Sequence, residues 1–112
     1  MQTSNRYLVY MTAGSRDEAR TIGRVLVESR LAACVNILDN MTSLYSWEGR
    51  VQEDREVVLI AKTTADRFSA LKEKVTAVHS YDCPWILGFQ AADGHAPFLD
   101  WIRESVVDEA VC

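Results

Sequence analysis

The chain has 112 residues, of which 48% are hydrophobic and 25% are charged. This composition is that of an ordinary globular protein and argues against disorder. The length is that of one domain, so we expect a single domain over residues 1–112. A net charge of −4 gives nucleic acid no electrostatic attraction to the chain as a whole, so we expect no nucleic-acid partner.

The cysteines indicate a reducing compartment. Cys34, Cys83 and Cys112 are far apart and odd in number, whereas a disulfide framework favours an even, dense set. No Cys-x-x-Cys pair occurs, which argues against a structural zinc site. The N-terminal apolar run is short and has no basic flank, so we expect neither a secretory signal nor a membrane span. These features predict a cytoplasmic protein without a membrane partner.

Apolar runs and helical spacing predict seven elements. In chain order they are a strand at Tyr7–Met11, a helix at Arg16–Arg30, strands at Ala33–Trp47 and Val51–Lys62, a helix at Ala65–Val78, a strand at Trp85–Ala91 and a short helix from Pro97 to about Val106. This order predicts an α+β, ferredoxin-like βαββαβ fold, an antiparallel sheet with helices on one face. The fold would carry an extended hairpin between the second and third strands and an extra C-terminal helix. We expect residues 108–112 to form a loose tail.

Local signals support the element boundaries. Ser15-x-x-Glu18 and Thr63-x-x-Asp66 have the spacing of capping boxes, in which a side-chain oxygen accepts from a backbone N–H three residues later. Glu48-Gly49 is typical of a tight hairpin turn, and Asp39-Asn40 are poor strand formers that could mark a bulge. Gly23 inside a helix suggests close packing onto the sheet.

The predicted hairpin is long for so small a domain. A straight strand over Ala33–Trp47 would measure about 50 Å, whereas a compact chain of this length is about 35 Å across. Its outer half would carry Tyr45, Trp47 and unpaired backbone groups into water, unless other copies of the chain pair with it. We therefore predict an oligomer interface at Tyr45, Trp47, Glu48 and Gly49. Alternatively, Tyr45 and Trp47 fold back and cover the core of their own domain.

Three separated motifs resemble the CutA divalent-cation-tolerance family: LVESRLAACVNIL at Leu26–Leu38, SLYSWEGRVQEDREVVLIAKTT at Ser43–Thr64 and HSYDCP at His79–Pro84. The similarity covers nearly the whole chain. The resemblance implies a ferredoxin-like subunit in a homotrimer whose long hairpins join the sheets of neighbouring subunits. It also implies a non-catalytic, cytoplasmic role in tolerance of copper and other divalent ions, with copper as the ligand and no cofactor required.

The residues suggest a partial copper site. His79, Asp82 and Cys83 lie within five residues, and imidazole and thiolate suit copper. The family's copper ligands correspond to Met11, His79 and Trp85 here, so only the histidine is retained. We therefore predict weak copper binding through His79, with Cys83 or Met11. Alternatively, His79 is a solvated or helix-capping residue and Met11 fills the core.

Other functions of this fold have weaker support in the sequence. An acylphosphatase-like enzyme would need a basic phosphate loop, and Arg16 is the one positive charge near Thr12–Ser15. An RNA-binding sheet would carry aromatic residues where Val57–Ile60 lies. The main alternative is a trimeric signalling protein resembling the PII proteins. It would bind a small anionic metabolite at subunit clefts through Lys62, Arg67 and the first amides of the Arg16–Arg30 helix.

Overall fold

The computed structural model describes residues 5–107, so the predicted loose tail at 108–112 lies outside the described residues. The elements, in chain order, are β1 (Arg6–Ala13), α1 (Arg16–Glu28), β2 (Cys34–Trp47), β3 (Arg50–Thr64), a 3₁₀ turn (Ala65–Arg67), α2 (Phe68–Val78), β4 (Ile86–Gln90) and α3 (Ala96–Ser105). None of the helices in this part of the chain has the length and apolar run needed to cross a membrane.

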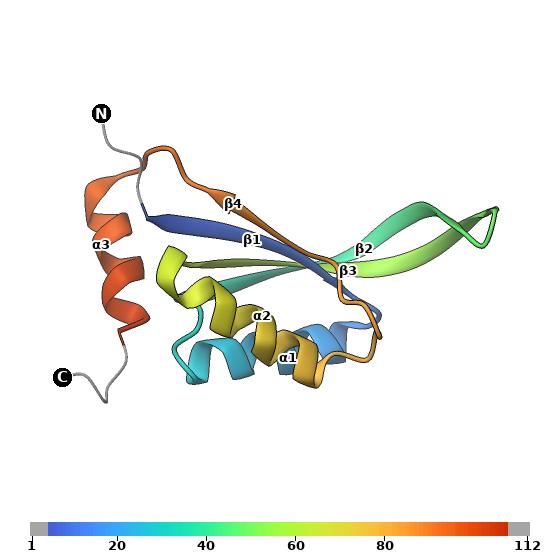
Figure 1. Cartoon of the computed structure of the whole chain (residues 1–112), viewed down its shortest axis with the longest axis horizontal. Helices are drawn as coiled ribbons and strands as arrows, with labels where there is room; N and C mark the ends of the chain where they lie inside the picture. Colours follow the sequence, from blue (N-terminus) through green and yellow to red (C-terminus); the bar gives the residue numbers. More distant parts are fainter. Residues whose placement is uncertain (1–4, 108–112) are drawn as a thin grey trace.

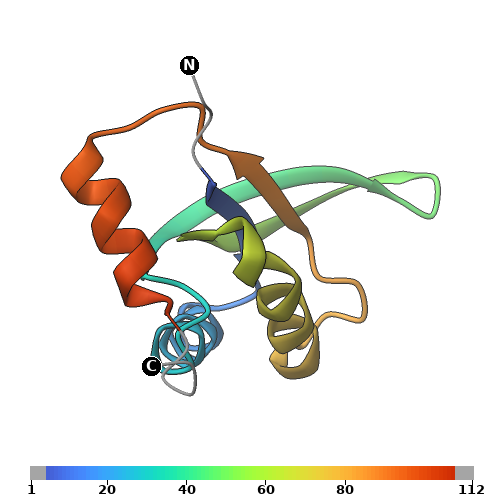
Figure 2. The ribbon, with the colours of Figure 1, turned by 60° about the vertical axis from the view of Figure 1, so that its left-hand side comes forward.

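The four strands form one antiparallel sheet in the order β2-β3-β1-β4. Helices α1 and α2 lie side by side on one face of it, and α3 lies at the end of the sheet opposite the hairpin tip (Figures 1 and 2). This α+β, ferredoxin-like arrangement with an extended β2–β3 hairpin and an additional C-terminal helix confirms the predicted fold.

The core lies between the sheet and the two helices. Its fully buried large side chains come from the sheet and from both helices: Val9, Met11 and Leu59 of the sheet, Ile22 and Leu26 of α1, and Leu71 and Val75 of α2. Burying an aliphatic side chain of this size stabilises the fold by about 1.5–3 kcal/mol. Gly23 lies where α1 packs on the sheet, and a Cβ there would be 3.4 Å from Cγ1 of Val35, in van der Waals contact with it.

The hairpin of β2 and β3 projects from this core (Figure 1). Its two-residue turn has positive φ at both central residues, 52° at Glu48 and 78° at Gly49, as a tight hairpin turn requires. The predicted bulge is confirmed: the register shifts between Leu38 and Met41, and Asn40 has φ of 64°. The described chain measures 48 × 32 × 21 Å, with a radius of gyration of 15.0 Å. A compact chain of this length has a radius of about 13 Å, so the hairpin elongates the molecule.

Helix α3 closes the end of the sheet through a small apolar cluster and two arginines. Ile102 and Val106 pack with Ala33. Nε of Arg6 donates to the carbonyl oxygen of Leu99 at 2.9 Å, and Nε of Arg67 donates to that of Val106 at 2.9 Å. These bonds connect β1 and the start of α2 to the third helix.

The second predicted capping box, Thr63-x-x-Asp66, was wrong. Strand β3 continues to Thr64, so Thr63 is a buried strand residue whose hydroxyl donates to the carbonyl oxygen of Leu31 at 2.7 Å. The residue that precedes the 3₁₀ turn is Thr64, and no side-chain cap is formed there.

Candidate functional site

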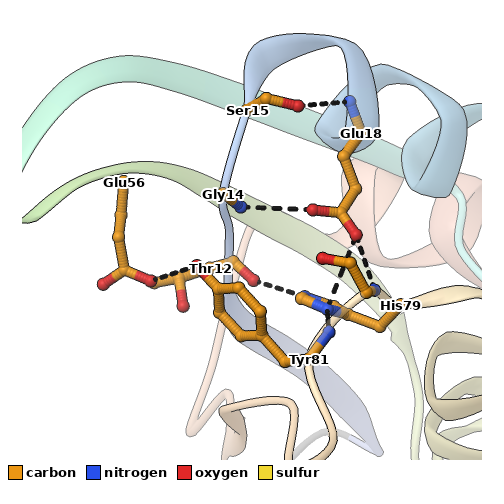
Figure 3. Close-up of polar contacts among 8 residues, drawn as sticks. Thr12, Gly14, Ser15, Glu18, Glu56, His79 and Tyr81 are labelled. Carbon is orange, nitrogen blue, oxygen red and sulfur yellow. Dashed lines mark hydrogen bonds and ion pairs between the residues drawn. The ribbon is translucent and has the colours of Figure 1, made fainter.

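The start of α1 is capped by its own sequence. Ser15 has extended backbone, and its Oγ accepts from the N–H of Glu18 at 3.1 Å. The carboxylate of Glu18 turns back, and its Oε1 accepts from the N–H of Gly14 at 3.2 Å. The first predicted capping box is thus confirmed, with Gly14 as the backbone donor. Figure 3 shows both bonds at the top of the cluster.

Glu18 also reaches the segment between α2 and β4, the 79–85 loop. Its second oxygen, Oε2, accepts from the N–H of Ser80 at 2.7 Å and lies 3.7 Å from Nδ1 of His79. Burial raises the pKa of Glu18, but the hydrogen bonds from Ser80 and Gly14 outweigh it, so the pKa lies below its ordinary value of 4.5. The carboxylate therefore fixes the loop to the helix as an anion.

His79 is the centre of this cluster (Figure 3). Its side chain is 1% exposed. Nδ1 accepts from the N–H of Tyr81 at 3.0 Å, which leaves Nε2 to donate to the carbonyl oxygen of Thr12 at 2.8 Å. These two bonds specify the neutral tautomer with the proton on Nε2. Both ring nitrogens are therefore engaged by backbone groups.

Tyr81 leads from this cluster to a buried carboxylate. Its ring lies 4.5 Å from that of His79, and its hydroxyl donates to Oε2 of Glu56 at 3.0 Å. Burial and the neighbouring Glu56 raise the pKa of Tyr81, so the phenol remains a donor. Glu56 is 4% exposed, and its other oxygen, Oε1, has no hydrogen-bond partner. A buried polar atom left unpaired in this way costs about 1–3 kcal/mol.

Beside Glu56 the surface is hollowed into a cleft of about 450 Å³. We call it the aromatic cleft, and nine residues of the hairpin and the 79–85 loop line it: Tyr45, Trp47, Gln52, Asp54, Glu56, Tyr81, Asp82, Cys83 and Trp85. Tyr45 and Trp85 meet edge to face, with ring centroids 5.5 Å apart. The hydroxyl of Tyr45 donates to Oδ2 of Asp54, and this bond raises the pKa of Tyr45. The walls are thus aromatic, and the charges on them are carboxylates.

The three predicted copper ligands have different environments. Met11 is 1% exposed and belongs to the core cluster. His79 is buried with both nitrogens bonded, and Cys83 is an exposed free thiol in the aromatic cleft. Over residues 5–107, no group of three or more His, Cys, Asp or Glu side chains is arranged to hold a metal ion. Cys83 is therefore the accessible donor of the three.

The predicted interface residues lie at the end of the hairpin. Trp47 is 60% exposed, while Tyr45 is half-buried against Trp85. Glu48 and Gly49 form the exposed turn. Neither aromatic residue is part of the main core cluster; both line the aromatic cleft instead.

The groups expected to bind an anion already have protein partners. Lys62 donates to Oδ1 of Asn36, and Arg67 donates to Val106. At the start of α1, the amides of Gly14 and Glu18 are taken by side-chain oxygens. Lys62, Arg67 and these two amides are thus each bonded within the protein.

Sequence reasoning did not find Glu56, Tyr81 or Asp54 as site residues, and it considered Trp85 only as a position where the family's copper ligand is not retained. One signal was available, because Gln52, Asp54 and Glu56 alternate along β3 and so share one face of the strand. That Glu56 is buried depends on Tyr81, which lies 25 residues later in the chain. The sequence alone carries no sign of that contact.

Comparison with known proteins shows the family. The family described as "CutA1 divalent ion tolerance protein" matches residues 7–105. The divalent-cation tolerance protein CutA of Thermus thermophilus is 49% identical over 98 residues, which cover 88% of this chain and 95% of that protein. Human protein CutA is 38% identical over 102 residues, covering 88% of this chain but 57% of the longer human protein, and the chain spans 64% of the Xenopus laevis homologue.

Solved structures of divalent cation tolerance proteins have the same fold as this chain. A divalent cation tolerance protein from Thermus thermophilus superposes with a TM-score of 0.89 at 47% identity, covering 91% of this chain and 99% of that one. CutA1 from Oryza sativa superposes with a TM-score of 0.91 at 34% identity, covering 96% and 98%. The family's profile covers every strand and helix of the fold except the first residue of β1, and the chain belongs to the CutA1 divalent ion tolerance family.

Proposed function

We propose that the protein is a non-catalytic homotrimer that acts in tolerance of divalent cations in the cytoplasm. Membership of a family named for divalent ion tolerance supports the role, and the family resemblance gives the number of subunits. The free thiols of Cys34 and Cys83 favour a reducing compartment. The main observation in support of the assembly is that one face of the sheet, which the helices do not cover, is apolar and exposed.

That surface, the outer face, is the side of the sheet opposite α1 and α2. The strand register places Leu8 beside Phe89, and Leu87 beside Tyr10, on this side. Leu8, Leu87 and Phe89 are 38%, 58% and 53% exposed. A contiguous row of large apolar side chains in water is typical of a surface that another chain covers.

The hairpin also carries exposed apolar side chains, beyond the core of the subunit. Leu44, Trp47 and Val51 are 65%, 60% and 78% exposed. Strand β2 lies at the edge of the sheet and has 14 residues, so a long row of its backbone groups is open to pairing. Pairing with the sheets of neighbouring copies would bury both the side chains and the edge.

Light scattering on the purified full chain tests the assembly. A mass three times that of the 12.6 kDa chain at micromolar concentration is expected. A monomer at that concentration would overturn the proposal, because the outer face and the hairpin would then be exposed in solution.

For the metal, we propose weak copper binding with Cys83 as the accessible ligand. His79 could contribute only by releasing Thr12 or Tyr81, since both of its nitrogens are bonded. Copper titration by calorimetry should give weaker binding for Cys83→Ser than for wild type. An unchanged isotherm for both Cys83→Ser and His79→Ala would contradict a site at these residues.

The tolerance role is tested in cells. A strain that lacks its own family member should grow better in raised copper when it expresses this chain. Expression of a Trp47→Ala variant would show whether the assembly matters for that effect. Equal growth with and without the chain would speak against the tolerance role.

A further inference from the structure

The aromatic cleft is incomplete in a single chain. Glu56, which lines it, is 4% exposed, and its Oε1 has no hydrogen-bond partner, whereas the large majority of buried polar side-chain atoms in folded proteins are paired. Tyr45 and Trp47 line the same cleft and belong to the surface that we propose for the trimer. Because the cleft is continuous with that surface, the occupant that fits it is a neighbouring copy of the chain.

The charges that line the cleft favour a cationic donor. Its nine lining residues include no Lys, Arg or His but three carboxylates, those of Asp54, Glu56 and Asp82. One oxygen of Asp54 and one of Glu56 accept from tyrosine hydroxyls, which are neutral donors and leave the negative charges uncompensated. A buried charge without a partner of opposite sign is costly. An arginine or lysine of the neighbouring copy would supply the missing donor and the missing charge together.

Arg50 is the cation of the hairpin that lies on the required face. Side chains alternate along β3, so Arg50 shares a face with Asp54 and Glu56, whereas Arg55 lies on the opposite face. Arg50 is exposed beside the turn at the tip, which projects away from the core (Figure 1). Six residues of extended strand, about 20 Å, separate it from Glu56 of its own chain, farther than an arginine side chain extends. Arg50 can therefore complete the cleft of another copy but not that of its own chain.

The symmetry of a trimer requires a contact of this kind. A closed ring of three identical chains joins two different surfaces, because each chain contacts the next in the same way. The hairpin face that carries the cleft has two such surfaces: a tip with Arg50 and a base with the carboxylates of Asp54 and Glu56. Contact between the tip of one chain and the base of the next can repeat around the ring until it closes.

We propose that, in the trimer, Arg50 of each chain enters the aromatic cleft of the next chain and donates to Oε1 of Glu56 there. Its guanidinium group would lie among the aromatic rings of the cleft, which attract cations. The inference rests on the proposed trimer and names the residue that the neighbouring copy contributes. It assigns no ligand to Cys83, so the proposed copper binding is tested separately.

Light scattering of the full chain across a dilution series tests the contribution of Arg50. The trimer of Arg50→Met should dissociate at a concentration at least about tenfold higher than wild type, because the change leaves Glu56 buried and unpaired. Arg50→Lys, which retains a cation with N–H groups, should lie between the two. Glu48→Gln is the matched control, since it removes an acidic group from the same turn, and it should not loosen the trimer. Equal loosening by Arg50→Met and Glu48→Gln would overturn the proposal, as would an Arg50→Met trimer that dissociates at the wild-type concentration.

A double-mutant cycle identifies the partner of Arg50. If Arg50 pairs with Glu56, Arg50→Met should shift the dissociation of the Glu56→Gln trimer much less than that of wild type. A shift of the same size in both backgrounds would place Arg50 elsewhere and refute the pair. Because Glu56 is buried and its variant requires a folding check, Arg50→Met at an exposed position gives an independent result. A monomeric wild-type chain would refute the proposed trimer itself, whereas a trimeric wild type that Arg50→Met does not loosen would refute the Arg50 contact alone.

Discussion

Nε2 of His79 lies 2.8 Å from the carbonyl oxygen of Thr12, so one imidazole joins the end of α2 to the end of β1, 67 residues earlier. Its other nitrogen accepts from Tyr81 within the same loop. The histidine that sequence reasoning selected for metal binding thus has a structural role in this conformation: it orients the loop that carries Tyr81, Cys83 and Trp85 into the aromatic cleft.

Replacing His79 should destabilise the fold. His79→Ala removes two buried hydrogen bonds, and we expect the free energy of unfolding to fall by about 1–3 kcal/mol in urea denaturation. His95→Ala is the matched control, because His95 is exposed and makes no side-chain cap bond to α3. Its effect should stay within about 0.5 kcal/mol. Equal effects of the two variants would contradict the structural role.

The lowered pKa of Glu18 predicts a pH-dependent contribution to stability. Because its folded-state pKa lies below the ordinary 4.5, the stabilisation is present above the unfolded-state pKa and is lost as the pH falls through the folded-state value. Glu18→Gln should therefore be less stable than wild type at neutral pH, and the difference should shrink in strongly acidic solution. Urea denaturation from pH 7 down to about pH 3 measures this.

Asp17→Asn controls for the helix dipole, since Asp17 lies in the same first turn but is exposed. Its stability difference from wild type should be the smaller of the two at neutral pH. A difference for Glu18→Gln that does not depend on pH would mean that the ionised carboxylate is not what stabilises the loop.

Trp47→Ala should loosen the proposed trimer before it unfolds the subunit. Trp47 is 60% exposed in the single chain and contributes little to its core, so its ring is available to a neighbouring copy. Sedimentation or light scattering across a dilution series should show dissociation at a higher concentration than for wild type. Trp101→Ala, which removes a 44% exposed tryptophan on α3, should leave the mass unchanged. A Trp47→Ala protein that dissociates no more readily would remove the hairpin tip from the interface.

Two glycines that face side chains should respond differently to alanine. A Cβ at Gly88 would lie 2.6 Å from Cζ of Phe68, so Gly88→Ala should cost about 1–3 kcal/mol by overpacking. At Gly23 the nearest atom is 3.4 Å away, and alanine gains up to about 1 kcal/mol of helix propensity, so Gly23→Ala should be near neutral or stabilising. Thermal unfolding distinguishes them. Partial rescue of Gly88→Ala by Phe68→Leu would identify the ring as the cause.

Sequence patterns predicted the features that depend on neighbouring residues. The cap at Ser15 and Glu18, the turn at Glu48-Gly49 and the bulge at Asn40 each follow from local backbone chemistry. The prediction of a capping box at Thr63-x-x-Asp66 was wrong because β3 pairs with β1 up to Thr64, so Thr63 is a strand residue and does not precede a helix.

The candidate site was less accessible to sequence reasoning, because its contacts are long-range. Glu18 could be recognised as a capping residue, but its bond to Ser80 joins positions 62 residues apart. Likewise, Glu56 is an unremarkable polar strand residue until Tyr81 covers it. Only the folded arrangement of loop and hairpin shows these as one cluster.

The bulge in β2 has a consequence for the aromatic cleft. Before it, Leu38 is opposite Val58; after it, Met41 is opposite Glu56. The strand β2 therefore advances three residues while β3 advances two. Successive side chains of a strand alternate between faces. Compared with regular one-to-one pairing, the extra residue in β2 therefore places the other set of outer β2 residues on the same face as Glu56.

If β2 and β3 paired residue for residue at this point, Asn40 would be opposite Glu56, and Leu44 and Ser46 would take the places of Tyr45 and Trp47 on its face. The bulge thus decides that the aromatic side chains of the hairpin lie on the same face as the buried carboxylate. Deleting Asn40 would restore regular pairing and leave Met41 opposite Glu56, so the residues of the cleft would stay on one face.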